Sequence, residues 1–415
     1  MRDPKSLFWI GLTASVGVCM LSGCRTHDFP EHPANYREFA YVANSGSNTV
    51  SIFDVVHVRL DREIQVGQNP TGVTSNPKRN EVYVVNSGSN TGSGTNGSVS
   101  VIDAEKNTVV ATIPVHKRPY FIDVDADGNF AYVANSGSNS VSVIDLKLRR
   151  EVAVLGTGEG PGLARITPDG RSLVVTNRLG NSVSIFSAGS DSDSNRQDSN
   201  RQVRKVIEGC PGATDIAILP DSSKAFVACS SGHQIMAIAL AKDGSTNPSS
   251  NARPDSRPDA RPDALEALLD VGRSPVHLAL KPDGGELFVS NFDSDSISEV
   301  ATSTNDVGGA YIMGSHPVRG IVNEDNSLLY ESNFRSQEIS IYSIDDGKRL
   351  VLPMPLHVGD GPDALAFSSD GNLLFAVDAG SGDVAVIRTS SRTLFTLLPT
   401  GRQPNSIAVK AFKVP

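Results

Sequence analysis

The chain has 415 residues, of which 39% are hydrophobic and 20% are charged, so it can bury a large core. This composition excludes a disordered or a collagen-like chain. The 37 basic residues are outnumbered by 46 acidic ones, and the formal net charge of -9 gives no general attraction to nucleic-acid phosphates. We therefore expect no nucleic-acid partner.

The first 23 residues are predicted to be a cleaved leader. Two bases, Arg2 and Lys5, precede an apolar run over residues 7–21. This run is shorter than the roughly 20 residues that a membrane-spanning helix needs. An ordinary signal peptide or a buried helix is the alternative to the more specific interpretation that follows.

The apolar run ends in the sequence Leu-Ser-Gly-Cys at Cys24, which resembles the lipobox of bacterial lipoproteins. The resemblance implies that Cys24 is the lipidated first residue of the mature chain, and that residues 24–38 form a tether to the membrane. Arg25 follows the cysteine, which by resemblance to the sorting of Gram-negative lipoproteins implies the outer membrane, with a periplasmic or surface face.

A short phrase recurs along the rest of the chain, and a fixed period of this kind is typical of arrays and propellers. The copies YVAN, YVVN, YVAN, VVTN, FVAC, FVSN, YESN and FAVD end at Asn44, Asn86, Asn135, Asn177, Cys229, Asn291, Asn333 and Asp378. A proline, in most copies three residues after a glycine, recurs at Pro70, Pro119, Pro161, Pro211, Pro275, Pro317, Pro362 and Pro404. Both markers occur eight times.

Each repeat reads as four short strands, here called a to d, with strand a after the proline and strand b at the YVAN phrase. Residues 173–176 and 182–185 alternate with period two, and Pro-Asp-Gly turns such as residues 168–170 separate the strands. Repeated four-stranded antiparallel sheets predict an all-β fold, an eight-bladed β-propeller, with seven blades as the alternative.

The two markers are offset, and this predicts how the ring closes. The first strand b, at residues 39–44, has no proline before it, and Pro404 has no strand b after it. Strand a at residues 406–409 would therefore pair with strand b at residues 39–44. The closing blade would combine both ends of the chain and remove the exposed sheet edges of an open array.

The recurring YVAN-SGSN-VSVID phrase resembles the YVTN-type β-propeller repeat family of archaeal surface-layer and bacterial envelope proteins. The resemblance covers residues 39–415 and implies the propeller fold. It implies little about activity, because propellers carry many unrelated functions.

Three insertions interrupt the repeats, and besides residues 91–97 between strands b and c, two lie between strands c and d of neighbouring blades, at residues 188–202 and 242–264. The last contains three Arg-Pro-Asp triplets, a composition that cannot build a core, so we expect the two c-to-d insertions to be disordered. They are either loop insertions that the fold tolerates or a docking tether for another envelope protein.

The proline-marked d-to-a loops are expected at the mouth of the central channel, where propellers usually hold ligands. A locally basic rim in an acidic protein would concentrate an anion there, although these side chains could equally be a solvated rim. The candidate ligand-binding residues are Lys117, Arg118, Tyr120, Arg273, His277, His316, Arg319 and Arg402.

Two further motifs are weighed against simpler explanations. Residues 123–128 have the D-x-D-x-D-G form of a calcium loop, but their last two residues align with the ordinary a-to-b turn and the required glutamate is missing. We predict no metal site. Cys210 and Cys229 lie at the same end of one hairpin and could form a disulfide in an oxidising compartment, or remain free.

No catalytic constellation is evident, and we expect no cofactor. The leading interpretation is a monomeric, lipid-anchored binding or scaffold module of the cell envelope, whose partner is an envelope protein or an anionic ligand. The alternative is a propeller enzyme of the lactonase or oxidoreductase type with its site at the channel mouth. A surface-layer or adhesion role is a third possibility.

Overall fold

The computed structural model describes residues 32–89, 96–188, 201–241, 262–344 and 350–414. The chain divides into residues 1–33, of which only His32 and Pro33 are described, and residues 34–415. The predicted leader, Cys24 and most of all three insertions lie outside the described residues. Strand β1 begins at Tyr36, so the last five residues of the expected tether belong to the folded unit and the last three of them to this strand.

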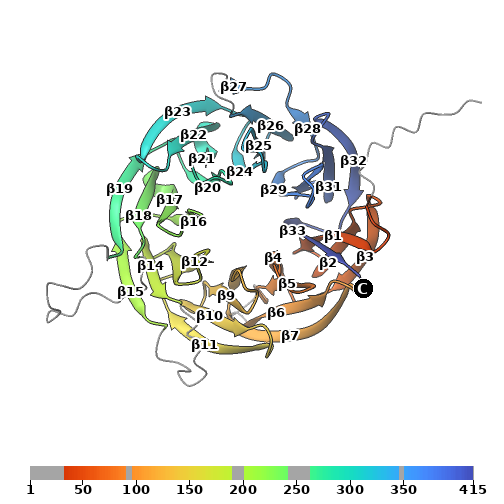
Figure 1. Ribbon diagram of the computed structural model, residues 1–415, viewed down its shortest axis with the longest axis horizontal. Helices are drawn as coiled ribbons and strands as arrows, with labels where there is room; N and C mark the ends of the chain where they lie inside the picture. The colour runs from red at the N-terminus through yellow and green to blue at the C-terminus, as the bar shows by residue number, and fades with distance from the viewer. Residues whose placement is uncertain (1–31, 90–95, 189–200, 242–261, 345–349, 415) are drawn as a thin grey trace, which may run out of the picture. The chain divides into compact units, whose positions relative to one another are not determined.

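Within the described residues of this unit the strands form eight antiparallel sheets arranged in a ring (Figure 1), which confirms the eight-bladed β-propeller. Each blade has four strands, and in blade 7 the outer strand is split in two. The only helices among the described residues are two short 3-10 turns, η1 (Ser230–Gly232) and η2 (Phe292–Ser294). No helix in the described ranges is long and apolar enough to cross a membrane.

The blades are numbered by their strand b, and the strands are given from the innermost to the outermost. Blade 1 contains β33 (Pro404–Lys413), β1 (Tyr36–Asn44), β2 (Thr49–Asp54) and β3 (Arg59–Gln65). Blade 2 contains β4 (Pro70–Ser75), β5 (Glu81–Asn86), β6 (Asn96–Asp103) and β7 (Thr108–Lys117). Blade 3 contains β8 (Pro119–Val124), β9 (Phe130–Asn135), β10 (Ser140–Asp145) and β11 (Arg150–Gly156). Blade 4 contains β12 (Pro161–Ile166), β13 (Ser172–Asn177), β14 (Ser182–Ser187) and β15 (Val203–Glu208).

The second half of the chain repeats this arrangement. Blade 5 contains β16 (Ala213–Ile218), β17 (Lys224–Cys229), β18 (Gln234–Ala239) and β19 (Ala264–Asp270). Blade 6 contains β20 (Pro275–Leu280), β21 (Glu286–Asn291), β22 (Ser296–Ala301) and β23 (Asp306–Ile312). Blade 7 contains β24 (Pro317–Val322), β25 (Leu328–Asn333), β26 (Glu338–Ser343), β27 (Leu350–Val351) and β28 (Leu356–His357). Blade 8 contains β29 (Pro362–Phe367), β30 (Leu373–Asp378), β31 (Asp383–Arg388) and β32 (Thr393–Pro399).

The two ends of the chain close the ring in blade 1, as the offset between the sequence markers predicts. Strand β33, near the C-terminus, pairs antiparallel with β1, and Ile407 lies opposite Val42. Figure 1 shows β33 on the inner side of β1 and β2. Every blade therefore has the same strand order, and the closing blade leaves no unpaired gap in the ring.

The hydrophobic core consists of layers between neighbouring blades. One layer joins Val174 and Val183 of blade 4 to Val227 and Met236 of blade 5, and equivalent layers join six other neighbouring pairs. Most buried residues come from strands a to c, whereas the outermost strands are mostly exposed or half-buried and add single buried residues such as Leu155. Stability therefore rests on contacts between adjacent blades.

The asparagine of the YVAN phrase has a structural role that explains its recurrence. Asn86 Nδ2 donates to the hydroxyls of Ser98 (3.1 Å) and Ser100 (3.0 Å) on the next strand. The glycine that stands three residues before most of the marker prolines makes room for it, since a Cβ on Gly67 would lie 2.5 Å from Asn86 Cγ. These motif residues hold the blades together and are not themselves evidence of a ligand site.

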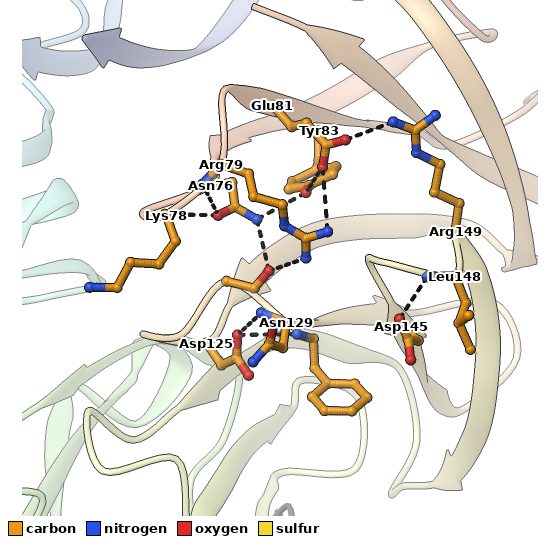
Figure 2. Close-up of polar contacts among 12 residues, drawn as sticks. Asn76, Lys78, Arg79, Glu81, Tyr83, Asp125, Asn129, Asp145, Leu148 and Arg149 are labelled. Carbon is orange, nitrogen blue, oxygen red and sulfur yellow. Dashed lines mark hydrogen bonds and ion pairs between the residues drawn. The ribbon is translucent and has the colours of Figure 1, made fainter. Parts of the chain in front are cut away.

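Side chains at both ends of the strands join successive blades. Near the strand-a starts, Asn48, which has a positive φ of 60°, accepts a hydrogen bond from Asn69 N at 2.8 Å. At the opposite end, Asn76 of blade 2 donates to the carbonyl of Gly128 in blade 3 at 3.0 Å, and Arg79 donates to the same oxygen (Figure 2). These contacts hold blade 2 against blades 1 and 3.

Blade 5 departs from the register that the sequence predicts. The residue opposite Cys229 is Ala213, whereas in the other seven blades the marker proline lies opposite the final residue of strand b. Pro211, the fourth marker proline, therefore does not begin strand a of blade 5, which starts at Ala213. Cys210 and Cys229 form a disulfide, with an S–S distance of 2.03 Å.

Candidate functional site

A cavity of about 830 Å³ lies at the centre of the ring. Residues of all eight innermost strands line it, together with residues of d-to-a loops such as Gly160 and of b-to-c loops such as Leu179. We call the end of the channel formed by these loops the mouth. The volume of the cavity suits a small organic ligand.

Four of the eight residues expected at the channel mouth line this cavity, namely Arg118, Tyr120, His277 and Arg319. Lys117, Arg273, His316 and Arg402 do not. Arg273 donates to the carbonyl of Asp293 at 2.8 Å in its own blade. The His316 ring packs edge-on against Phe292, with ring centroids 4.4 Å apart.

Three polar side chains occupy equivalent positions in successive blades. Asp215, His277 and Arg319 are the third residues of β16, β20 and β24, and all three line the cavity. His277 Nδ1 lies 2.6 Å from Asp215 Oδ2, and its Nε2 lies 3.0 Å from the carbonyl oxygen of Gly320. Because both partners are acceptors, the imidazole satisfies both only when each ring nitrogen carries a proton. His277 thus links blades 5, 6 and 7.

Both carboxylate oxygens of Asp215 have partners within the protein. Its oxygens also accept hydrogen bonds from Ile216 N and Leu278 N, each at 2.9 Å. Burial alone would raise the pKa of Asp215, but the charge and hydrogen bond of His277, with Arg165 and Arg319 nearby, outweigh it and lower the pKa to about 2. Asp215 therefore stays ionised and holds His277 in place.

Arg165, the fifth residue of β12, lines the same cavity. Its guanidinium stacks over the ring of Phe121 at 4.5 Å and lies 3.5 Å from Asp123 Oδ1. Burial raises the pKa of Asp123, although Arg165 and the Ile166 N–H act in the opposite direction. Asp123, which begins the D-x-D-x-D-G sequence, thus faces an arginine and a backbone donor, which is not the arrangement of a calcium loop.

Arg319 is the least satisfied of these side chains. Its Nε is buried and has no hydrogen-bond partner among the described residues. Behind it lies Glu331 of β25, which is fully buried and whose two oxygens also have no partner there. Ser290 Oγ lies close to Glu331 but not in hydrogen-bonding geometry. Burial raises the pKa of Glu331 to about 8, although Ser290 and Arg319 act in the opposite direction.

The lining is basic although the whole chain is acidic. Its basic residues are Arg118, Arg165, Arg178, His277 and Arg319, and its acidic residues are Asp215 and Asp363. Two of the arginines, Arg165 and Arg319, lie within strands rather than in loops. The described residues contain no group of three His, Cys, Asp or Glu side chains that could hold a metal ion.

The sequence analysis missed Arg165, Arg178, Asp215 and Glu331. An alignment of the eight repeats by strand position could have identified such residues, because it shows a charged side chain where the other copies have an apolar one. Glu331, for example, replaces a residue that is valine or alanine in every other copy. For Asp215 the shifted register of blade 5 hides this signal.

No known protein family's sequence profile matches the chain, and no curated protein sequence does either. The resemblance to YVTN repeats therefore stays a prediction. Solved structures do share the fold. The dihydro-heme d1 dehydrogenase NirN, in complex with DHE, is 17% identical with a TM-score of 0.68, over 91% of this chain and 76% of that one.

Two further similar structures carry names from another enzyme class. A candidate 6-phosphogluconolactonase of Bacteroides fragilis is 15% identical with a TM-score of 0.59, over 93% of this chain and 100% of that one. The periplasmic gluconolactonase PpgL of Pseudomonas aeruginosa is 16% identical with a TM-score of 0.56, over 92% and 99% of the two chains. At these identities the likeness shows the propeller fold alone.

Proposed function

We propose that this protein is a binding module of the cell envelope whose central channel holds a small anion. The observation that carries the proposal is Arg319, a channel-lining arginine with a buried Nε that no described residue satisfies. A buried donor without a partner is costly, and a carboxylate or phosphate oxygen would satisfy it.

The surrounding side chains favour the same ligand charge. Arg165 lines the same cavity and lies 3.5 Å from the carboxylate of Asp123, with the ionised Asp215 also nearby. Walls of low dielectric strengthen the field of such fixed charges within a cavity. An anion would therefore gain two charged partners whose positions the strands already fix.

The enzyme alternative is supported by the fold likeness to proteins named as gluconolactonases and a dehydrogenase. The polar pair in the channel is not free for acid–base work, however. Both nitrogens of His277 and both oxygens of Asp215 are engaged in contacts within the protein. A general base needs a free acceptor atom, so the binding function is the better supported of the two.

Calorimetric titration of the full chain with small carboxylates and phosphates tests the proposal. We expect binding that weakens at least tenfold in Arg319→Gln. The matched control is Arg273→Gln, which removes an exposed arginine outside the cavity and should bind like the wild type. Absence of binding to every anion, or equal binding by both variants, would overturn the proposal. Turnover of a sugar lactone that depends on Asp215 would instead favour the enzyme.

The envelope location is a proposal supported by the sequence of the leader alone. If Cys24 is lipidated, Cys24→Ser will release the protein from membranes into the soluble fraction. A Cys19→Ser variant, which changes a cysteine within the apolar run, is the control and should stay membrane-bound. Retention of Cys24→Ser on membranes would remove the anchor from the proposal.

A further inference from the structure

We infer that the anion bound in the channel carries an apolar body, so that the ligand is an amphipathic carboxylate or phosphate rather than a sugar acid or an inorganic ion. This inference rests on the proposed anion-binding function. It concerns the mouth of the channel, where large apolar side chains line the cavity.

The mouth exposes two large apolar side chains. Tyr120 is 54% exposed and Leu179 is 65% exposed, and both line the cavity together with Phe292. Exposed apolar groups that line a concave site, rather than scattered over a surface, indicate contact with an apolar ligand.

Two of these side chains, Leu179 and Phe292, stand where other copies of the repeat have glycine or serine. In blades 1 and 3 the loop after strand b reads Asn-Ser-Gly-Ser-Asn, whereas in blade 4 it reads Asn177-Arg178-Leu179-Gly180-Asn181. The loop after β21 of blade 6 likewise has Phe292 in place of serine. The blades therefore share a backbone but differ in what they present to the channel.

The neighbouring loop of blade 4 is shaped around Leu179. Gly160 has a positive φ of 59°, and a Cβ there would lie 2.6 Å from Leu179 Cγ. Only glycine fits both this backbone conformation and this close approach. Leu179 thus packs against Gly160 and also lines the channel.

Arg165 and Arg319 lie within strands, deeper in the channel than Tyr120 and Leu179, whereas Arg118 and Arg178 lie beside these two residues at the mouth. The innermost strands run from the mouth into the channel, so the fifth residue of β12, Arg165, lies deeper than the second residue of β8, Tyr120. Phe121, whose ring stacks with Arg165, lies between them in the lining. A ligand with its anionic head at Arg165 and Arg319 would place its body against Tyr120 and Leu179.

A sugar acid does not fit this arrangement equally well. Its hydroxyl groups would lose water against Leu179 and Phe292 without gaining a hydrogen-bond partner from these side chains, and polar groups that lose water without new partners weaken binding. An arene or alkyl chain would instead gain from covering the same side chains.

Competitive titration of the full chain with naphthalene-2-carboxylate, octyl phosphate, 6-phosphogluconate, inorganic phosphate and the neutral 2-naphthalenemethanol tests the inference. We expect the two amphipathic anions to bind at least tenfold more tightly than the two hydrophilic anions and than the neutral alcohol. The double variant Tyr120→Ser/Leu179→Ser should lose at least fivefold in affinity for naphthalene-2-carboxylate and keep its affinity for phosphate. Leu148→Ser, which changes an exposed leucine outside the cavity lining, is the matched control and should change neither.

The outcomes separate the inference from the proposed function. Equal affinity for hydrophilic and amphipathic anions, with loss of both in Arg319→Gln, overturns the apolar body and leaves the anion site. Absence of binding to any anion overturns both. Naphthalene-2-carboxylate binding that the double variant and Leu148→Ser affect equally also overturns the inference, because the apolar contact would then lie elsewhere.

Discussion

Glu331 is an acid at a position that is apolar in the seven other repeats, which have Val42, Val84, Val133, Val175, Val227, Val289 and Ala376 there. It is fully buried beside Gly320, where a Cβ would come within 2.6 Å of Glu331 Oε2. The glycine therefore makes room for the carboxyl group. Because burial raises its pKa to about 8, Glu331 is mostly protonated at neutral pH and does not itself neutralise the charge of Arg319.

This arrangement predicts that anion binding depends on pH. As the pH rises from 7 to 9, Glu331 loses its proton, its charge attracts Arg319 and repels an anion, and the affinity falls, on the order of tenfold. In Glu331→Gln the side chain stays neutral, so the affinity measured by titration at pH 7, 8 and 9 should be constant. An identical pH dependence in wild type and Glu331→Gln would contradict this assignment.

Asp378 is a second acid at a position of the repeat that is otherwise Asn in six copies and Cys in one. Its partner on the next strand is Asp383, where five other copies have serine or threonine, and both carboxyl groups approach Gly359. Burial and the neighbouring Asp383 raise the pKa of Asp378 to about 8. The buried side chain is therefore protonated in the folded protein well above the pH at which it ionises in the unfolded chain.

A folded-state pKa above the unfolded value means that folding takes up a proton between about pH 4 and pH 8, so stability falls as the pH rises through this range. Asp378→Asn restores the common residue and removes the effect. We expect its melting temperature at pH 8.5 to exceed that of the wild type by at least about 2 °C, with little difference at pH 4.5. A variant that melts below the wild type at pH 8.5 would show that the pair stabilises the blade.

At the scale of elements, the ends of the two c-to-d insertions are tied together. Arg204 of β15 and Asp263, which precedes β19, form a bidentate ion pair at 2.8 and 2.9 Å, with side chains only 1% and 5% exposed. Asp263 also accepts a hydrogen bond from Ala241 N at 2.9 Å. Asp263 belongs to the third Arg-Pro-Asp triplet, so the end of this tract is part of the fold even though its composition is that of a linker.

Asp263→Ala leaves a buried arginine without its counter-charge. We expect a loss of about 3–5 kcal/mol in the free energy of unfolding, measured by denaturant titration. Lys106→Ala, which breaks the exposed ion pair with Asp103, is the control and should cost less than about 1 kcal/mol. A small effect of Asp263→Ala would mean that another carboxylate replaces it.

At the scale of the whole molecule, the ring depends on its last strand. β33 pairs with β1 and also supplies Asn405, Ser406 and Ile407 to the channel lining. Without it, β1 would have an unpaired inner edge and the cavity would be open on one side. A closed ring of nearest-neighbour contacts also distributes stability over every blade.

Deletion of residues 404–415 should therefore abolish the cooperative thermal transition and lead to aggregation, as an exposed sheet edge predicts. Deletion of residues 245–258, within the insertion at residues 242–264, is the control, and we expect its melting temperature to stay within about 2 °C of the wild type. Both are measured by calorimetry. A truncated protein that still melts cooperatively near the wild-type temperature would show that the ring tolerates an open blade.

The sequence alone determined the fold class, the eight blades and the closure by both chain ends. It could do so because the markers recur at fixed spacing and because each repeat alternates with the period of a strand, which are local properties. It also indicated that the mouth is basic, since Arg118 and Arg319 lie beside the marker prolines.

Only the tertiary structure decided which side chains face one another. Asp215, His277 and Arg319 lie far apart in the chain and meet because successive innermost strands surround one channel. The shifted register of blade 5 concealed Asp215, since two extra residues displace it from the marker proline. The depth of Arg165 below Tyr120 and the burial of Glu331 follow from the packing of neighbouring blades, which no single repeat encodes.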